Sequence, residues 1–379
     1  MCLKLGAVEL TLLAAMAGCS HTSPYFRSDI VPPVTSVSPH EAVRQRILLA
    51  GDAGDTKVSR EALGVLTEWA SDIPDRTLVV FLGDNIYPAG MPAQEHPTRA
   101  AAEESLDAQL AVITSSGARG FFISGNHDWA DDGEGGLDAV RRQEEYVNAA
   151  LGCDGNFLPA GGCGIPAKIE LNGVRVVALN TAWWLHSEGL ARQADPQAEK
   201  TRVIEAIEST LTGVEGLDVV VISHHPLASH GTHGGFYDWK DHLFPSTHLV
   251  EGLWIPTPVI GSLYPLLRSL VFNRQTLAGT EYTDMRMHLT KALATNPPLV
   301  YAAGHDHGLQ VLEGGSAAEY YLVSALGLDV GASMGHGKDT LFAHLHAGFM
   351  VLDFMESGTV LLRVVEQREE EVAFSMWMK

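Results

Sequence analysis

The sequence is poor in basic residues. Of its 379 residues, 46 are Asp or Glu and only 25 are Lys or Arg, so the formal net charge is −21 with His neutral. A protein that neutralises a phosphate backbone needs clustered Lys and Arg, and we therefore expect no nucleic-acid partner. An acidic enzyme that acts on an anionic substrate needs a local positive centre instead, which bound metal ions supply.

Cysteine is scarce, with four residues in the chain. Cys2 and Cys19 lie in an N-terminal segment with an early Lys, an apolar run and a small-residue patch, which resembles a secretory signal with a lipoprotein cleavage site. The alternative is a frayed N-terminal helix. We expect residues 1–18 to be a signal peptide and Cys19 to carry a lipid. Only Cys153 and Cys163 then remain, in a Gly-rich loop, where export favours a disulfide and a cytosolic location would leave free thiols.

The expected location follows from that N-terminal segment. A lipid on Cys19 makes the protein an exported, membrane-anchored lipoprotein of the cell envelope, and without the lipid it would be periplasmic or secreted. Residues 252–272 offer a second contact with a membrane surface. Prolines at 256, 258 and 265 exclude a regular transmembrane helix there. The segment is therefore either a buried subdomain or an interfacial lid that touches lipid.

Apolar runs alternate with helical patterns from residue 46 onward, which is typical of a layered α/β fold. The expected strands are 47–50, 78–82, 120–124, 174–180, 219–223, 299–303, 320–324, 348–354 and 360–365, and the expected helices are 59–70, 99–112 and 196–211. We place a linker at 19–44, a catalytic domain at 45–366 with an insert at about 234–298, and a C-terminal tail at 367–379.

Five of these strands run directly into a cluster of Gly, His and Asp. The clusters are GDAG (51–54), GDNIY (83–87), GNHD (125–128), SHHP (223–226) and GHDH (304–307). Any one of them could be a simple turn, because Gly and Asp are common turn residues. All five follow apolar strands, however, and sites in open α/β sheets form outside the carboxyl ends of strands, so the clusters are expected to converge on one crevice.

The clusters supply seven candidate metal ligands, namely Asp52, Asp84, Tyr87, Asn126, His224, His305 and His307. Mixed carboxylate, imidazole and amide donors suit transition metals such as Fe, Mn or Zn. Two metals that share one carboxylate would each receive four protein donors. That arrangement leaves room for water or substrate.

The ordered set GDxG, GDxxY, GNHD, VxxH and GHxH is similar to that of the purple acid phosphatases within the calcineurin-like metallophosphoesterase superfamily. The stretches GDNIYPAG and GHDHGLQ most resemble the small tartrate-resistant type. The resemblance implies an α/β fold, the metallophosphoesterase four-layer sandwich, in which helices flank two mixed β-sheets and the site lies at the C-terminal ends of strands. The general superfamily has DxH in its first motif. Here Gly54 replaces that His, and Tyr87 supplies the missing donor as a phenolate, which favours Fe(III).

The resemblance also implies a role for each site residue. The first metal takes Asp52, Asp84, Tyr87 and His307, and the second, Fe(II), Zn or Mn, takes Asp84 as a bridge with Asn126, His224 and His305. His127 is expected to stabilise charge on the phosphoryl group. His233 is expected to protonate the leaving oxygen, with His225 and His230 as alternates.

The implied activity is that of an acid phosphatase-like hydrolase, a dimetal phosphomonoesterase that acts on small phosphate esters by attack of a metal-activated hydroxide, without a covalent phosphoenzyme. Two alternatives remain. The same site could serve a phosphodiesterase or phospholipid-headgroup hydrolase, or the chain could be a catalytically inactive surface lipoprotein, which loss of ligands would mark.

Overall fold

The computed structural model describes residues 23–30, 43–237, 242–244, 246, 255–257, 274–327, 333–367 and 372–378. The expected signal peptide, Cys19 and most of the 252–272 segment lie outside these residues. Among the residues described, none of the helices combines the length and the apolar character needed to cross a membrane.

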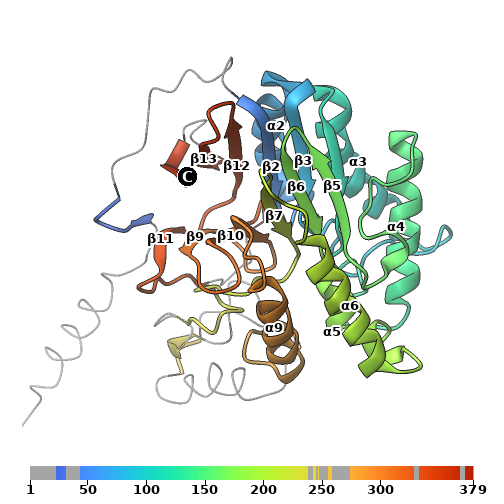
Figure 1. Ribbon diagram of the computed structural model, residues 1–379. Coiled ribbons are helices and arrows are strands. Elements are labelled where there is room, and N and C mark those ends of the chain that lie inside the picture. Colours follow the sequence, from blue (N-terminus) through green and yellow to red (C-terminus); the bar gives the residue numbers. More distant parts are fainter. Residues whose placement is uncertain are drawn as a thin grey trace, which may run out of the picture.

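Two mixed sheets form the centre of the described chain (Figure 1). The six-stranded sheet has the order β14 (Val372–Trp377), β13 (Val360–Glu366), β12 (Gly348–Met355), β2 (Val43–Ala50), β3 (Thr77–Phe81) and β4 (Arg119–Phe122). The eight-stranded sheet has the order β1 (Tyr25–Phe26), β11 (Thr340–His344), β9 (Leu309–Glu313), β10 (Tyr320–Ser324), β8 (Val300–Ala303), β7 (Asp218–Ile222), β6 (Val174–Ala178) and β5 (Ala167–Leu171).

The parallel strands are the ones that lead to the predicted ligands. In the first sheet β2, β3 and β4 are parallel neighbours, and in the second β6, β7, β8 and β10 are parallel in that order. The remaining pairs within both sheets are antiparallel. Since parallel strands end at the same edge of a sheet, each sheet gathers its strand-end clusters at one edge.

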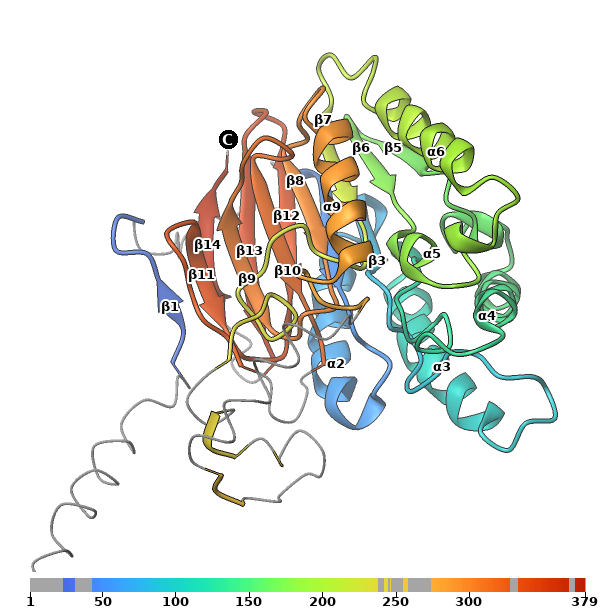
Figure 2. The same ribbon diagram turned by 90° about the horizontal axis from the view of Figure 1, so that it is seen from below.

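Strand β2 shows why the fold has four layers. Ile47 and Leu49 pack into a core that contains strands of both sheets, whereas Leu48 and Ala50 pack into a second core shared with the helices. A strand buried on both faces needs apolar residues at every position, which explains the continuous apolar runs in the sequence. Two sheets therefore face each other, with helices on the outside (Figure 2).

The main helices are α2 (Thr56–Asp72), α3 (Arg99–Ser116), α4 (Gly136–Leu151), α5 (Thr181–Leu185), α6 (Pro196–Thr210) and α9 (Thr280–Leu293). Helices α2, α3 and α4 contact one another in succession, and α9 contacts α5 and α6. Asp195 caps α6 by accepting a hydrogen bond from the Ala198 N–H, with Pro196 in the first turn. The expected four-layer α/β sandwich with two mixed sheets is thus confirmed.

The C-terminal segment differs from the expected tail. Within residues 367–379, β14 pairs antiparallel with β13, and the Phe374 ring is 1% exposed and stacks on Phe342 with centroids 5.1 Å apart. The burial of Phe374 explains why this segment belongs to the sheet. At the other end, residues 25 and 26 of the expected linker form β1 and pair with β11.

The predicted disulfide between Cys153 and Cys163 is wrong. Both residues are exposed free thiols. The Cys153 sulfur lies 3.7 Å from the Leu151 carbonyl oxygen, and the Cys163 sulfur lies 3.8 Å from the Ile165 carbonyl oxygen. A disulfide needs two sulfurs about 2.05 Å apart and facing side chains. Here each sulfur is directed at its own stretch of backbone, so the Gly-rich loop does not bring the two together.

Candidate metal centre

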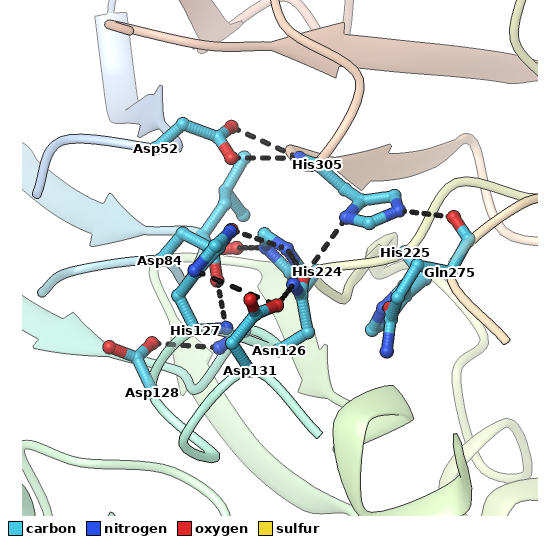
Figure 3. A network of polar contacts seen from close by, with 12 residues as sticks. Asp52, Asp84, Asn126, His127, Asp128, Asp131, His224, His225, Gln275 and His305 are labelled. Carbon is cyan, nitrogen blue, oxygen red and sulfur yellow. Dashed lines mark hydrogen bonds and ion pairs between the residues drawn. The ribbon is translucent and has the colours of Figure 1, made fainter. Parts of the chain in front are cut away.

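Both sheets contribute to one cluster of polar side chains (Figure 3). Asp52, Asp84 and Asn126 follow β2, β3 and β4, while His224 and His305 follow β7 and β8. Two short contacts join these strand ends. The Asp52 N–H donates to the Gly83 carbonyl over 2.9 Å, and Nδ1 of His224 lies 2.9 Å from the Leu82 carbonyl oxygen of the facing sheet. The five expected clusters therefore converge.

One group of donor atoms matches the set predicted for the first metal. The Tyr87 Oη atom lies 3.4 Å from Asp52 Oδ1, 3.4 Å from Asp84 Oδ2 and 3.2 Å from His307 Nε2, and His307 Nε2 lies 3.5 Å from Asp52 Oδ1. A single hydroxyl proton cannot serve three acceptors. Metal bonds of about 2.0–2.2 Å place neighbouring ligand atoms roughly 3.0–3.5 Å apart, so the four side chains fit a cation.

A second group of donor atoms meets at the Asn126 side chain. Asn126 Oδ1 lies 3.1 Å from His224 Nε2 and 3.0 Å from His305 Nδ1, and His224 Nε2 lies 3.2 Å from Asp84 Oδ2. These are the four side chains predicted for the second metal.

The tautomers of the two imidazoles indicate what this second group holds. Nδ1 of His224 and Nε2 of His305 each lie within 2.9 Å of a main-chain carbonyl oxygen, which can only accept. Those nitrogens therefore carry a hydrogen, so the other nitrogen of each ring, which faces Asn126 Oδ1, holds either a second proton or a cation. A lone pair facing an oxygen is favourable only with a proton or a cation between them, so the group fits a second metal ion.

Asp84 belongs to both groups. Its Oδ2 atom faces Tyr87 on one side and His224 on the other, and its Oδ1 accepts the His127 N–H over 2.9 Å. Burial alone would raise the pKa of Asp84, but the attraction of His224 and His127 outweighs it and lowers that pKa. Burial likewise opposes protonation of His224, and the Asp84 charge overcomes it and raises the His224 pKa to about 9. The carboxylate is therefore ionised, and its Oδ2 atom lies between the two groups of donor atoms.

Gly54 leaves no room for a side chain beside the loop that carries Asp84 and Tyr87. A Cβ atom at Gly54 would lie 2.7 Å from the Ile86 nitrogen and 2.8 Å from the Asp84 carbonyl oxygen, and the Gly54 N–H donates to that oxygen over 3.0 Å. No side chain fits at position 54 unless the loop that carries Asp84 and Tyr87 moves. Packing at Gly54 and the donor atom of Tyr87 thus depend on each other.

The outer histidines occupy different environments. His127 is 25% exposed, and its Nδ1 lies 2.7 Å from the Pro88 carbonyl oxygen. Burial lowers the pKa of His127, but Asp84 and Asp131 outweigh it, so the net shift is upward. His127 therefore places a partly exposed imidazole at the rim of the site.

The two candidate proton donors also differ. His233 is half-buried, and its ring centroid lies 4.2 Å from that of His305. His225 is completely buried, with Nδ1 at 2.9 Å from Thr181 Oγ1 and Nε2 at 2.9 Å from Gln275 Oε1. Burial and then the His224 charge lower the His225 pKa well below its usual value. The geometry therefore favours His233 for proton donation, and the third alternate, His230, contacts Asp339.

Sequence reasoning left three supporting residues without a role. Asp128 is buried, accepts from the N–H groups of residues 85, 86 and 125, and its pKa is raised to about 7 by burial and then by Asp84. Asp306 accepts from Ser229 Oγ and from the N–H groups of His233 and Gly234. Both aspartates lie inside the quoted clusters, so their positions were visible. Gln275, which contacts three histidines, has no local signal.

Two solved structures resemble the chain over most of its length. GAP50, the anchor in the inner membrane complex of Plasmodium, matches with a TM-score of 0.57 and 15% sequence identity over 88% of this chain and 87% of GAP50. The purple acid phosphatase PPD1 from yellow lupin (Lupinus luteus) seeds matches with a TM-score of 0.50 and 16% identity over 88% of this chain. The chain spans about half, 53%, of the lupin enzyme. No family model and no curated protein matches the sequence. What is shared is the fold, which is of the metallophosphoesterase type.

The shared position of Asp84 predicts different metal losses for two substitutions. Asp84→Asn should lower the content of both metals, because it removes the charge of the bridge, whereas His305→Ala should deplete only the second. The measurement is metal content per chain after dialysis. His288→Ala on α9, where the ring contacts Asp284, is the matched control and should retain both metals. Unchanged metal content in Asp84→Asn would contradict the ligand scheme.

Proposed function

We propose that the protein is a dimetal phosphomonoesterase of the purple acid phosphatase type. The observation that carries this proposal is the Asp84 carboxylate, whose Oδ2 atom lies 3.4 Å from Tyr87 Oη and 3.2 Å from His224 Nε2 and so joins two groups of donor atoms. The fold shared with the lupin phosphatase supports it. Tyr87 would hold Fe(III) at the first position, with Fe(II), Zn or Mn at the second.

Two bound cations supply Lewis acidity that activates water and neutralises the charge of a phosphate ester. The residues of the chain do the rest. Asp84 would keep the two cation positions adjacent. Its burial keeps bulk water from weakening the attraction between the carboxylate and the cations. His127, at the rim, is placed to donate a hydrogen bond to a phosphoryl oxygen as charge develops on it. His233 is the group placed to give a proton to the leaving oxygen.

A non-catalytic anchoring role is the second candidate. It is favoured by the likeness to GAP50, which is described as an anchor. The presence of all seven predicted ligands in two compact groups favours catalysis, because an inactive relative has no need to keep donor atoms in coordinating positions.

The substrate class can be tested directly. We expect the purified protein to hydrolyse p-nitrophenyl phosphate faster than the diester bis(p-nitrophenyl) phosphate. The rate should fall roughly a hundredfold or more in Asp84→Asn, because dimetal chemistry supplies several kcal/mol. Faster cleavage of the diester would favour the phosphodiesterase alternative. Two bound metals without hydrolysis of either ester would overturn the enzymatic proposal and favour an anchor.

A phenolate bound to ferric iron absorbs visible light by charge transfer, so the oxidised protein should be pink to purple. Tyr87→Phe keeps the ring and removes the oxygen, and it should therefore bleach the colour and weaken the first metal while the fold persists. Absorption spectra with parallel iron analysis measure this. Tyr146→Phe is the matched control, since its hydroxyl donates to Asp107, outside both donor groups. Colour that survives Tyr87→Phe would assign the iron to another phenolate.

Export with a lipid on Cys19 is a separate proposal that rests on the N-terminal sequence. The expressed full-length protein should fractionate with membranes, and Cys19→Ala should release it. Cys2→Ala is the control and should leave the protein in the membrane fraction, because Cys2 lies within the removed signal. Full-length cytoplasmic protein that retains Met1 would refute export.

A further inference from the structure

Gln275 lies outside the five strand-end clusters, yet it contacts three histidines of the site, and Figure 3 shows its bond to His305. It stands in the carboxyl-terminal half of the insert expected at about 234–298, and it is 7% exposed. Its main-chain carbonyl accepts from His305, a member of the second group of donor atoms, and its side-chain amide bonds to His225 and Asp132. The residue therefore connects the insert to the candidate metal centre.

The carbonyl oxygen of Gln275 accepts from two imidazoles. It lies 2.7 Å from His305 Nε2 and 2.9 Å from His233 Nδ1. Since the carbonyl can only accept, both nitrogens carry hydrogen. This bond fixes the tautomer of His305 in which Nδ1 presents its lone pair toward Asn126 Oδ1, as a metal ligand requires. The Leu277 N–H, which donates to the His233 carbonyl over 3.0 Å, holds the same segment in place.

The side chain of Gln275 has one orientation that satisfies its neighbours. Asp132 Oδ2 lies 3.0 Å from Gln275 Nε2, and a carboxylate accepts, so the amide NH₂ must face it. Gln275 Oε1 then faces His225 Nε2, which donates to it, and His225 Nδ1 accepts from the Thr181 hydroxyl. Asp132 thus sets the orientation of the amide and, through it, the tautomer of His225.

Asp132 belongs to a turn that also orients Asn126. Ala130, Asp131 and Asp132 have φ values of 60°, 49° and 64°, three consecutive residues in the left-handed region that side chains rarely adopt. Asp131 Oδ1 lies 3.4 Å from Asn126 Nδ2, on the side opposite the imidazoles. A backbone in such a conformation persists only where the surrounding contacts hold it in place, and backbone strain of this kind is frequent at functional sites.

We propose that Gln275 and Asp132 form a clamp, in which Asp132 fixes the Gln275 side chain and the Gln275 carbonyl holds His305 in its coordinating orientation, so that the insert is fastened to the second metal position. Both are positioning residues that act through ligands. The clamp depends on the proposed two-metal function. Outer partners of this kind typically change metal affinity by about 10- to 100-fold when they are lost.

The test is calorimetric titration of the metal-free full chain with Zn²⁺, which reads binding without any assay of activity. We expect two binding events in the wild type. Gln275→Met keeps the length of the side chain and the main-chain carbonyl but removes the amide, so the carbonyl that orients His305 is no longer anchored by Asp132. It should therefore weaken one binding event about 10- to 100-fold, while the other changes by less than about threefold. Gln45→Met is the matched control, because Gln45 is also buried, but its amide donates to the carbonyl oxygens of Arg46 and Arg76 at the far end of β2.

Substitution of Asp132 separates the hydrogen bond from the charge. Asp132→Ala and Asp132→Asn both remove the negative charge, but only the asparagine keeps an oxygen that can accept from Gln275 Nε2. Asp132→Ala should therefore weaken the same event as Gln275→Met, and Asp132→Asn should bind within about threefold of the wild type. The double variant of Gln275→Met and Asp132→Ala should bind Zn²⁺ no more weakly than either single variant. All three lose the same interaction, the hydrogen bond between Gln275 and Asp132.

Three outcomes would overturn the clamp. The first is a Zn²⁺ affinity of Gln275→Met equal to that of the wild type. The second is an equal loss of Zn²⁺ affinity in Asp132→Asn and Asp132→Ala. The third is a loss in the double variant equal to the sum of the two single losses. If Gln275→Met does not fold, the comparison at the exposed Asp132 decides the question. A wild-type chain that binds no Zn²⁺ would overturn the proposed function as well, which distinguishes that failure from failure of the clamp alone.

Discussion

The site depends on the burial of two carboxylates at the junction of two sheets. Asp52 and Asp84 are 0% and 2% exposed, and an isolated buried carboxylate is far too costly to keep without compensation. Hydrogen bonds from main-chain N–H groups supply part of it, since Asp52 accepts from His305 and Asp84 from His127. The imidazoles and the phenol around the two carboxylates supply further donor atoms. Cations bound among these donor atoms would compensate the remaining negative charge of the carboxylates.

The fold delivers these groups by ending parallel strands in sharp turns. Asp52, Asp84 and His305 have φ values of 56°, 54° and 68°, which turn each side chain away from its strand and toward the site. Glycine makes the close approach possible. A Cβ atom at Gly125 would lie 2.1 Å from Asp84 Oδ1, so the strand end that carries Asn126 can reach the bridging carboxylate only without a side chain there.

The sequence predicted what is encoded locally. Asp52 and Asp84 each follow a buried strand within two or three residues, so strand and ligand form one readable unit, and the sheets follow from the continuous apolar runs. The role of Gln275 could not be predicted, because its partners come from distant parts of the chain and its own neighbours in the sequence form none of the Gly, His and Asp clusters that mark the other site residues. β14 was missed because Phe374 is buried by rings of other strands, which no local pattern shows. The prediction of a disulfide was wrong because the composition of a loop does not determine the directions of its cysteine side chains.

The two donor groups differ in how they are held, and this suggests a division of labour. Around the first group, Gly54 packs against the backbone of residues 84–86, and buried hydrogen bonds join this backbone to Gly54 and Asp128. Around the second, Asn126 donates to the exposed Asp131 and His305 donates to the Gln275 carbonyl, so a strained turn and the insert orient these two ligands. Surface loops open at lower free energy than packed cores. The second position is therefore the one that a change in the insert can reach, whereas the first remains tied to the sheets.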